Sequence, residues 1–484
     1  MRNRSKIIKP IIFFFLVALV SSCSIKNTPV SLKSNVDLPS SFGEYTSNAI
    51  SLDYRNFFKD TVLISLIDTA ITSNYDVRIA MQRLKIARAG ILNQSANLIP
   101  DVFVGAGGGV YKYGNFTEEG VGNFDTNFSE NVNDNRRIPY PVTPNVNYGL
   151  SSSWEIDIWD KLKKLEQSAY YEYLSTEEGQ RLVVTELVAS VASVYYNLLE
   201  KENELEIIRK NIELQEQGVQ LINVQKVAGR VTELAVKQFN AQLLNSQSLE
   251  FAVKQDIFEL KNTLNLLLGR TITTLDRGPG ILNQELPEID SIGIPSDLLL
   301  NRPDLKQKEW QLQAANANIY AARAAFYPSL NINAFLGFET FKPRLMFNPG
   351  SLAFSTLANI TAPIFNRKRL QANLKRVEAE NYLLLYEYEQ NIIEAFSEVL
   401  INLRGIENTR LSYEFKQRQV QELQNAVATS NDLFLGGYAS YLEVVTAQRN
   451  VFEAELELMK ARNDQFEYLI NLYRSLGGGW EIEN

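Results

Sequence analysis

Two long stretches of the chain have apolar residues at alternating steps of three and four, the spacing of a helix that buries one face. Residues 160–268 form the first stretch, with a break at 227–231, and residues 366–476 form the second, with a break at 436–439. The 66 residues from 160 to 225 contain no proline and would extend roughly 100 Å as one continuous helix. Because ordinary globular helices are much shorter, we predict two long antiparallel helical hairpins.

The apolar period changes to two residues in two other stretches, 101–157 and 329–364. In the clearest run, Tyr148, Leu150 and Trp154 alternate with polar residues, so one face of the strand is apolar. Strands of about ten residues with this alternation are typical of a transmembrane β-hairpin. A half-buried hairpin of a soluble protein has the same pattern and remains the alternative. Between the first two strands, residues 114–144 are predicted to form an exposed loop.

The same order of elements occurs twice along the chain. Helices predicted from Asp60 and Asp76 precede the first pair of strands, and a helix that opens at 301–305 precedes the second pair. A shift of 228 residues aligns Pro100 with Pro328, and a shift of 208 residues aligns the glycines of the hairpin turns and hairpin ends, Gly229 with Gly437 and Gly269 with Gly477. These matches predict a tandem duplication.

The duplication divides the chain into segments. The first repeat covers 61–269 and contains the β-hairpin 101–157 and the helical hairpin 160–268. The second repeat covers 296–477 with the β-hairpin 329–364 and the helical hairpin 366–476. The proline-containing residues 270–295 form a linker between the repeats, and residues 478–484 form a C-terminal tail.

The N-terminal residues 1–22 have the organisation of a signal peptide. Four basic residues precede an apolar run of ten, which is too short to span a membrane. Small residues directly before Cys23 resemble a bacterial lipobox, which predicts cleavage before Cys23 and acylation of this cysteine. The alternative is a plain secretory signal with an incidental cysteine. If Cys23 is acylated, residues 23–60 form an acylated leader. Ser24, in place of aspartate, favours the outer membrane.

Composition excludes several classes of function. The net charge of −8 becomes −12 without the four basic residues of the signal, and an acidic chain without a basic cluster argues against nucleic-acid binding. The chain has no histidine and no cysteine other than Cys23, so histidine-based catalysis, a cysteine nucleophile in a folded cleft and the usual zinc sites are unavailable. We predict no enzymatic activity, no cofactor and no metal site.

Four strands in one chain cannot form a closed membrane barrel. An open sheet edge does not persist in hydrocarbon, and closure needs at least about eight strands. Either the strands lie outside a membrane, or several chains share one barrel. The apolar seams of the long helices also exceed what one pair of hairpins can cover, so the helices should pack into a larger cylinder.

Several motifs resemble the TolC family, in particular its acylated OprM/NodT-like outer-membrane branch. They are Gly293-Ile294-Pro295-Ser296-Asp297-Leu298-Leu299-Leu300-Asn301-Arg302-Pro303-Asp304, the segment 321–330, the strand-to-helix junctions 154–160 and 362–366, and the turn segment 437–449. The resemblance covers essentially the whole mature chain.

The resemblance implies a fold and a function. The fold is an α+β membrane protein: a homotrimer whose twelve-stranded β-barrel, with four strands from each chain, continues into a long periplasmic α-helical barrel. An equatorial region would be built from the leader, the linker and the C-terminus. The function is passive exit through the outer membrane for substrates that an inner-membrane pump, of the RND type, delivers through a periplasmic adaptor protein. Dilation of the helix tips would open the channel.

The resemblance also assigns roles to the turns of the helical hairpins. The adaptor would dock on the residues of both turns, which are Gly229, Arg230, Val231, Thr232, Gly437, Tyr438, Ala439 and Ser440. Glu443 lies where family members often carry an acid that lines the closed tip, and a ring of three carboxylates would attract cations. The alternative for Glu443 is a solvated charge on a helix face. Ala235 stands at the equivalent position of the first repeat, and Glu233 is the nearby substitute.

Two other functions compete with this interpretation. A coiled-coil stalk of the cell envelope would explain the long helices but not four strands with two-residue periodicity. A carboxylate-based hydrolase would need a globular cleft, and the helices leave little chain to build one.

Overall fold

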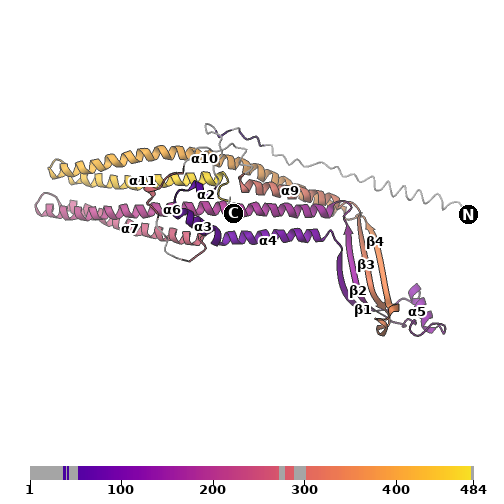
Figure 1. The fold of residues 1–484 in the computed structure, drawn as a ribbon. Coiled ribbons are helices and arrows are strands. Elements are labelled where there is room, and N and C mark those ends of the chain that lie inside the picture. Colours follow the sequence, from indigo (N-terminus) through magenta and orange to yellow (C-terminus); the bar gives the residue numbers. More distant parts are fainter. Residues whose placement is uncertain (1–35, 40, 43–52, 272–277, 288–300, 481–484) are drawn as a thin grey trace. The chain divides into compact units, whose positions relative to one another are not determined.

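The computed structural model describes residues 36–39, 41–42, 53–271, 278–287 and 301–480 (Figure 1). The predictions for the signal peptide, for Cys23 and for most of the leader lie outside the described residues, as does much of the predicted linker. The described chain divides into two compact units. One contains residues 88–172 and 311–385, and the other contains the described parts of 34–87, 173–310 and 386–484.

The first unit is built on an antiparallel sheet. Within the described residues it has four strands in the order β1-β2-β3-β4, which are β1 (Asp101–Tyr111), β2 (Thr143–Ile156), β3 (Ser329–Thr340) and β4 (Leu352–Thr361). Leu150 lies opposite both Val104 and Leu336, and Leu336 lies opposite Phe354. Because directly opposed residues share a face, most apolar positions of the four strands lie on one face, as the alternation predicted. Phe103, Phe335 and Leu357 are exceptions and lie on the other face.

A helix interrupts the predicted loop between β1 and β2. Helix α5 (Glu118–Phe128) occupies part of 114–144, so the prediction of a loop throughout this segment is wrong. The side chain of Thr117 accepts a hydrogen bond from the backbone N–H of Gly120 at 3.1 Å and caps the helix. The ring of Tyr140 packs against Phe124 and Phe128, with centroids 5.4 and 6.3 Å away. A cap and three aromatic rings thus stabilise a sequence with two glycines in eleven residues.

The helices occur where the three- and four-residue spacing predicted them. The longer helices are α3 (Thr61–Ser73), α4 (Tyr75–Ala96), α6 (Lys161–Val227), α7 (Glu233–Leu267), α9 (Pro303–Ala324), α10 (Arg367–Leu435) and α11 (Tyr441–Ser475). The described chain also has two short elements, α2 (Tyr54–Phe57) and the 3-10 turn η1 (Ile281–Asn283). Figure 1 shows α6 with α7, and α10 with α11, as two helical hairpins.

Corresponding helices in the two halves have closely related lengths. Helices α4 and α9 both have 22 residues and start 228 positions apart, whereas α7 and α11 both have 35 residues and start 208 positions apart. Helices α6 and α10 differ: they start 206 positions apart but end 208 positions apart, because α6 has 67 residues and α10 has 69. The second outgoing arm is therefore two residues longer than the first.

The helical unit buries an apolar core around α3. Leu63 and Ile67 of α3 are fully buried, and they belong to one cluster with Val188 of α6 and Phe466 of α11. Burial of each such side chain contributes about 1.5–3 kcal/mol. Helix α6 contains a stretch apolar enough to cross a membrane by composition, but 61% of that stretch is buried inside this chain. Its apolar character therefore serves the core of the helical unit.

A buried polar contact joins this core to the segment between the repeats. Asp60 caps α3 by accepting the N–H of Val62 at 2.8 Å. Its carboxylate also accepts hydrogen bonds from the hydroxyl of Tyr195 at 2.5 Å and from the amide of Gln284 at 2.6 Å. One carboxylate thus fixes the start of α3, the middle of α6 and the turn η1 to one another.

A network of ion pairs joins the start of α9 to the end of α11. Arg302 pairs with Asp304 at 2.8 Å and with Glu398 of α10 at 2.9 Å, and it donates to the carbonyl of Ser475. Arg474 also pairs with Glu398, and it bonds Glu186 of α6 at 2.9 Å. Arg302 and Asp304 therefore have a structural role, which the sequence alone did not predict.

Candidate functional site

The turn between α6 and α7 is a Schellman motif. Gly229 has a φ of +72°, and its N–H bonds the carbonyl of Lys226, while the N–H of Arg230 bonds the carbonyl of Gln225. A Cβ atom at Gly229 would meet no described atom within 4 Å, so the backbone angle alone requires glycine here.

The turn between α10 and α11 has the same construction. Gly437 has a φ of +78°, its N–H bonds the carbonyl of Phe434, and the N–H of Tyr438 bonds the carbonyl of Leu433. A Cβ atom at Gly437 would also meet no described atom within 4 Å. The two predicted docking turns are therefore equivalent in backbone as well as in sequence position.

The two acids named from the sequence make local contacts near these turns. The carboxylate of Glu443 accepts the backbone N–H of Ser440, the N-cap of α11, at 2.5 Å. This contact is half of a capping box, so Glu443 stabilises the helix start. Ser440-x-x-Glu443 is itself the sequence signature of that motif and could have revealed this role.

Glu233 belongs to the first turn of α7 and forms two ion pairs. Its carboxylate pairs with Lys226 of α6, and with Lys237 at 3.5 Å. The hydrogen bond from Lys226 and the charge of this lysine hold the pKa of Glu233 below its usual value. The Lys226 pair spans the turn and connects the last turn of α6 to the first turn of α7.

The position equivalent to Glu443 in the first repeat is buried. Ala235 is fully buried in a cluster with Ile222 and Phe239, against which Phe434 and Tyr441 of the second hairpin pack. A carboxylate at this position would be desolvated without a partner, so the first repeat cannot carry the same acid without loss of packing. This contact also places parts of both hairpins side by side beneath their turns.

Apolar side chains around both turns are exposed. The exposed fractions are 90% for Val227 and 66% for Leu435, which are equivalent positions, and 61% for Leu234 and 54% for Leu442, which are also equivalent. Tyr438 is 86% exposed at the second turn. Apolar surface of this kind on rigid helix ends is typical of a surface that binds another protein.

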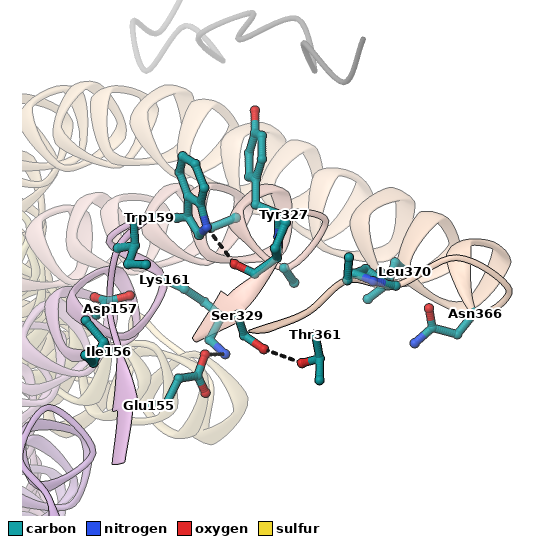
Figure 2. A pocket seen from close by; sticks show the side chains of 16 residues that line it. Glu155, Ile156, Asp157, Trp159, Lys161, Tyr327, Ser329, Thr361, Asn366 and Leu370 are labelled. Carbon is teal, nitrogen blue, oxygen red and sulfur yellow. Dashed lines mark hydrogen bonds and ion pairs between the residues drawn. The ribbon is translucent and has the colours of Figure 1, made fainter. Parts of the chain in front are cut away.

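A second region of interest lies where the strands meet the helices. A cavity of about 350 Å³ lies at this place, lined by the ends of β2 and β4 with the segments that follow them and by the start of β3 with the segment that precedes it. Figure 2 shows side chains that line it. The indole of Trp159 stacks on Tyr327 with centroids 4.8 Å apart and donates to the carbonyl of Pro328 at 2.8 Å. Lys161 pairs with Glu155 at 2.5 Å. Stacked aromatic residues whose polar N–H or O–H group forms a hydrogen bond are typical of a membrane–water boundary.

Among the described residues, no group of three or more acidic, histidine or cysteine side chains could hold a metal ion.

Comparison with known proteins gives consistent matches over most of the chain. The family model described as outer membrane efflux protein matches residues 66–270 and 294–478. The solvent efflux pump outer membrane protein SrpC of Pseudomonas putida is 32% identical over 439 residues, which cover 88% of this chain and 87% of the relative. The probable outer membrane lipoprotein SilC of Salmonella typhimurium is 30% identical over 428 residues, covering 88% of each chain.

A solved structure also has the same fold. The crystal structure of CusC, described as showing conformational changes that accompany folding and transmembrane channel formation, superposes with a TM-score of 0.80 at 28% identity. The match covers 93% of this chain and 99% of the CusC chain.

Proposed function

Because the chain belongs to the outer membrane efflux protein family, we propose that it is the outer-membrane channel of a tripartite efflux system. An inner-membrane pump of the RND type would supply the energy, and a periplasmic adaptor would pass substrates to this channel for passive exit. One observation carries the proposal: a sheet with one apolar face, whose edge strands β1 and β4 each have a single partner within the described chain.

The open edges support a shared barrel. In hydrocarbon the backbone groups of an unpaired edge would find no partner, so other copies must close the sheet. The resemblance to the TolC family sets the number at three, which would give a homotrimer with a twelve-stranded barrel. The matched element order and the shifts of 228 and 208 residues support an origin by tandem duplication.

Exposed apolar stripes on the helices support a tube made by several copies. On α7, Leu244, Phe251 and Phe258 recur at seven-residue spacing and are 54–69% exposed. On α10, Tyr386 and Ile393 have the same spacing and are 63% and 57% exposed. Heptad stripes that are exposed in the part of the chain that the structure describes fit packing against the helices of the next copy, which would form the periplasmic helical barrel.

The turns are the proposed docking surface for the adaptor. Their support is the rigid Schellman backbone at Gly229 and Gly437 and the exposed apolar residues beside each turn. Acylated Cys23 would attach each copy to the outer membrane, with most of the chain in the periplasm. Glu443 remains the proposed gating acid, in addition to its capping contact, and the tips would open by dilation.

Two measurements test the proposal. The first records conductance of the purified full-length protein in planar lipid bilayers, where a channel conducts and a stalk does not. The second uses the absence of native cysteines beyond Cys23. Thr232→Cys and Ser440→Cys place single thiols at the turns, and Glu213→Cys, roughly 20 Å back along α6, is the matched control.

The expected result is crosslinking in cells of both turn variants, but not of the control, to an adaptor identified by mass spectrometry. A trimer whose turns crosslink to nothing would refute the tripartite mechanism and leave the fold intact.

A further inference from the structure

The two places where a strand leads into a long helix are equivalent in position but differ in charge, one being neutral and the other positive. We call residues 155–164 the first junction and residues 361–370 the second junction; they lead from β2 into α6 and from β4 into α10, 206 positions apart. Both belong to the same compact unit.

The first junction pairs two of its three lysines with its own acids. Lys161 pairs with Glu155, and Lys163 pairs with Asp160 at 2.9 Å. The carboxylate of Asp157 accepts the backbone N–H groups of Leu162 and Lys163 at 3.0 and 2.9 Å. Its three acids and three lysines give no net charge, and its acids lie where the dipole of α6 favours them.

The second junction carries three cations and no acid. Thr361, Pro363 and Asn366 stand where the first junction has its acids. Arg367, Lys368 and Arg369 are all exposed, and the net charge of the segment is +3. The side chains of Lys368 and Arg369 form no hydrogen bond or ion pair with any part of the chain that the structure describes.

Local electrostatics do not favour this arrangement. Cations in the first turn of a helix oppose its dipole, so three of them weaken the start of α10 rather than stabilise it. An anion from outside the chain would offset this effect, because backbone N–H groups and guanidinium groups would then face the same negative charge.

Apolar surface leads directly to this cluster. Ile360, at the end of the apolar face of β4, is 75% exposed. Ile364 is 71% exposed, and Phe365 is fully exposed immediately before the cations. The ten residues of β4 extend roughly 33 Å, or about 23 Å along the membrane normal at a tilt of 45°, which is close to the height of the apolar band of a barrel. With the sheet in a membrane, as proposed above, the cations would lie at the level of the lipid headgroups.

We propose that the second junction binds the phosphate of a membrane phospholipid, with a preference for an anionic headgroup such as phosphatidylglycerol. Arg367, Lys368 and Arg369 would contact the phosphate, and Ile364 and Phe365 would contact the first carbons of the acyl chains. This inference rests on the proposed membrane location of the sheet. Each copy has one such site, and the sites together fix the depth of the barrel in the bilayer.

The test is lipid binding by the full-length protein in detergent, followed by native mass spectrometry. Phosphatidylglycerol or phosphatidylcholine of equal chain length is titrated, and bound lipids are counted per assembly. The variant Arg367→Gln/Lys368→Gln/Arg369→Gln removes the cations. Arg404→Gln/Arg410→Gln/Arg418→Gln makes the same charge change farther along α10 and is the matched control.

A second variant keeps the three cations and places acidic side chains beside them. Pro363→Asp with Asn366→Asp installs two acids at the positions of Asp157 and Asp160 in the first junction. These acids favour the helix start, so we expect this variant to fold as the wild type does.

We expect the wild type and the control to prefer phosphatidylglycerol, and both junction variants to bind it at least about tenfold more weakly. Equal binding by wild type and junction variants would overturn the proposal. Loss of the trimer in the triple variant, with no lipid preference in the wild type, would also overturn it and identify the cluster as a contact between copies. Retained conductance in either case would leave the proposed channel function standing.

Discussion

The capping contact of Glu443 makes a prediction that separates its structural role from a role in gating. Glu443→Gln keeps an oxygen that can accept the N–H of Ser440, whereas Glu443→Ala removes the acceptor. Loss of a cap costs about 1 kcal/mol. Loss of a negative charge near a helix N-terminus costs a further ~0.3–1 kcal/mol at an exposed position, and the residue is exposed here.

These magnitudes give different expectations for the two variants. The alanine variant loses both contributions, about 1.5 kcal/mol, so the start of α11 should open about tenfold more often. The glutamine variant loses only the contribution of the charge, which corresponds to an increase of about two- to fivefold. Hydrogen exchange of the amides in 440–446 measures this opening, and the amides around the Gly229 turn provide the internal control because they lack the contact.

The result that refutes the capping account is equal acceleration of exchange in both variants. Cation selectivity of the channel in bilayers is the second measurement. If both variants lose selectivity equally while Glu443→Ala accelerates exchange more than Glu443→Gln does, the carboxylate has a gating role separate from its cap. Unchanged selectivity in both variants would leave Glu443 as a cap only.

Three further predictions concern the helical unit. Gly405→Ala places a Cβ about 2.3 Å from the ring of Tyr468, so the overpacking should cost about 1–3 kcal/mol and lower the unfolding temperature. Tyr195→Phe removes the hydroxyl that donates a hydrogen bond to Asp60. The loss should lower stability by about 1–3 kcal/mol and be measured as faster hydrogen exchange in α3. Burial raises the pKa of Glu200, so the folded state loses stability as pH rises from the ordinary carboxyl pKa to this raised value. The stability advantage of Glu200→Gln in denaturant titrations should therefore grow across that pH range, and a constant difference would contradict this cause.

Much of the helical architecture could be predicted from the sequence because its signals are long. The apolar spacing continues for more than sixty residues in α6, and glycine marks the turn at Gly229. The structure places the ends of α6, α7, α10 and α11 within two residues of the predicted ends. The glycines locate the two turns because a Schellman motif needs glycine at one position only. The strand faces were predictable for a similar reason. A slip of the register by one residue would move the apolar side chains to the other face of the sheet.

Helix α5 was missed because its stability does not come from its own residues. Its sequence includes Gly120 and Gly122, which have poor helix propensity, and its apolar residues are few. The contacts with Tyr140, twelve residues beyond the end of the helix, are tertiary and have no local signal. The ion pairs of Arg302 with Glu398 were also unpredictable, because residues 96 positions apart meet only in the folded chain.

The two turns of the helical hairpins were predictable from the sequence, whereas their function as a site was not tested by the structure. The turn residues Gly229 and Gly437 occupy equivalent backbone positions, but their docking role remains a proposal. For Glu443, both interpretations need an exposed carboxylate in the first turn, so composition and spacing could not separate them. The capping signature Ser440-x-x-Glu443 was the available signal.

The two extra residues of α10 break the internal symmetry of the chain. Two residues add about 3 Å of rise and about 200° of rotation to an α-helix. A shift of 206 therefore matches the two halves at the base of the outgoing arms, and a shift of 208 matches them at the turns. Within one chain the halves are consequently not interchangeable, and a partner built from identical units would meet two different sites rather than one site repeated. Any comparison of mutations between the halves must change its numbering offset partway along the arm.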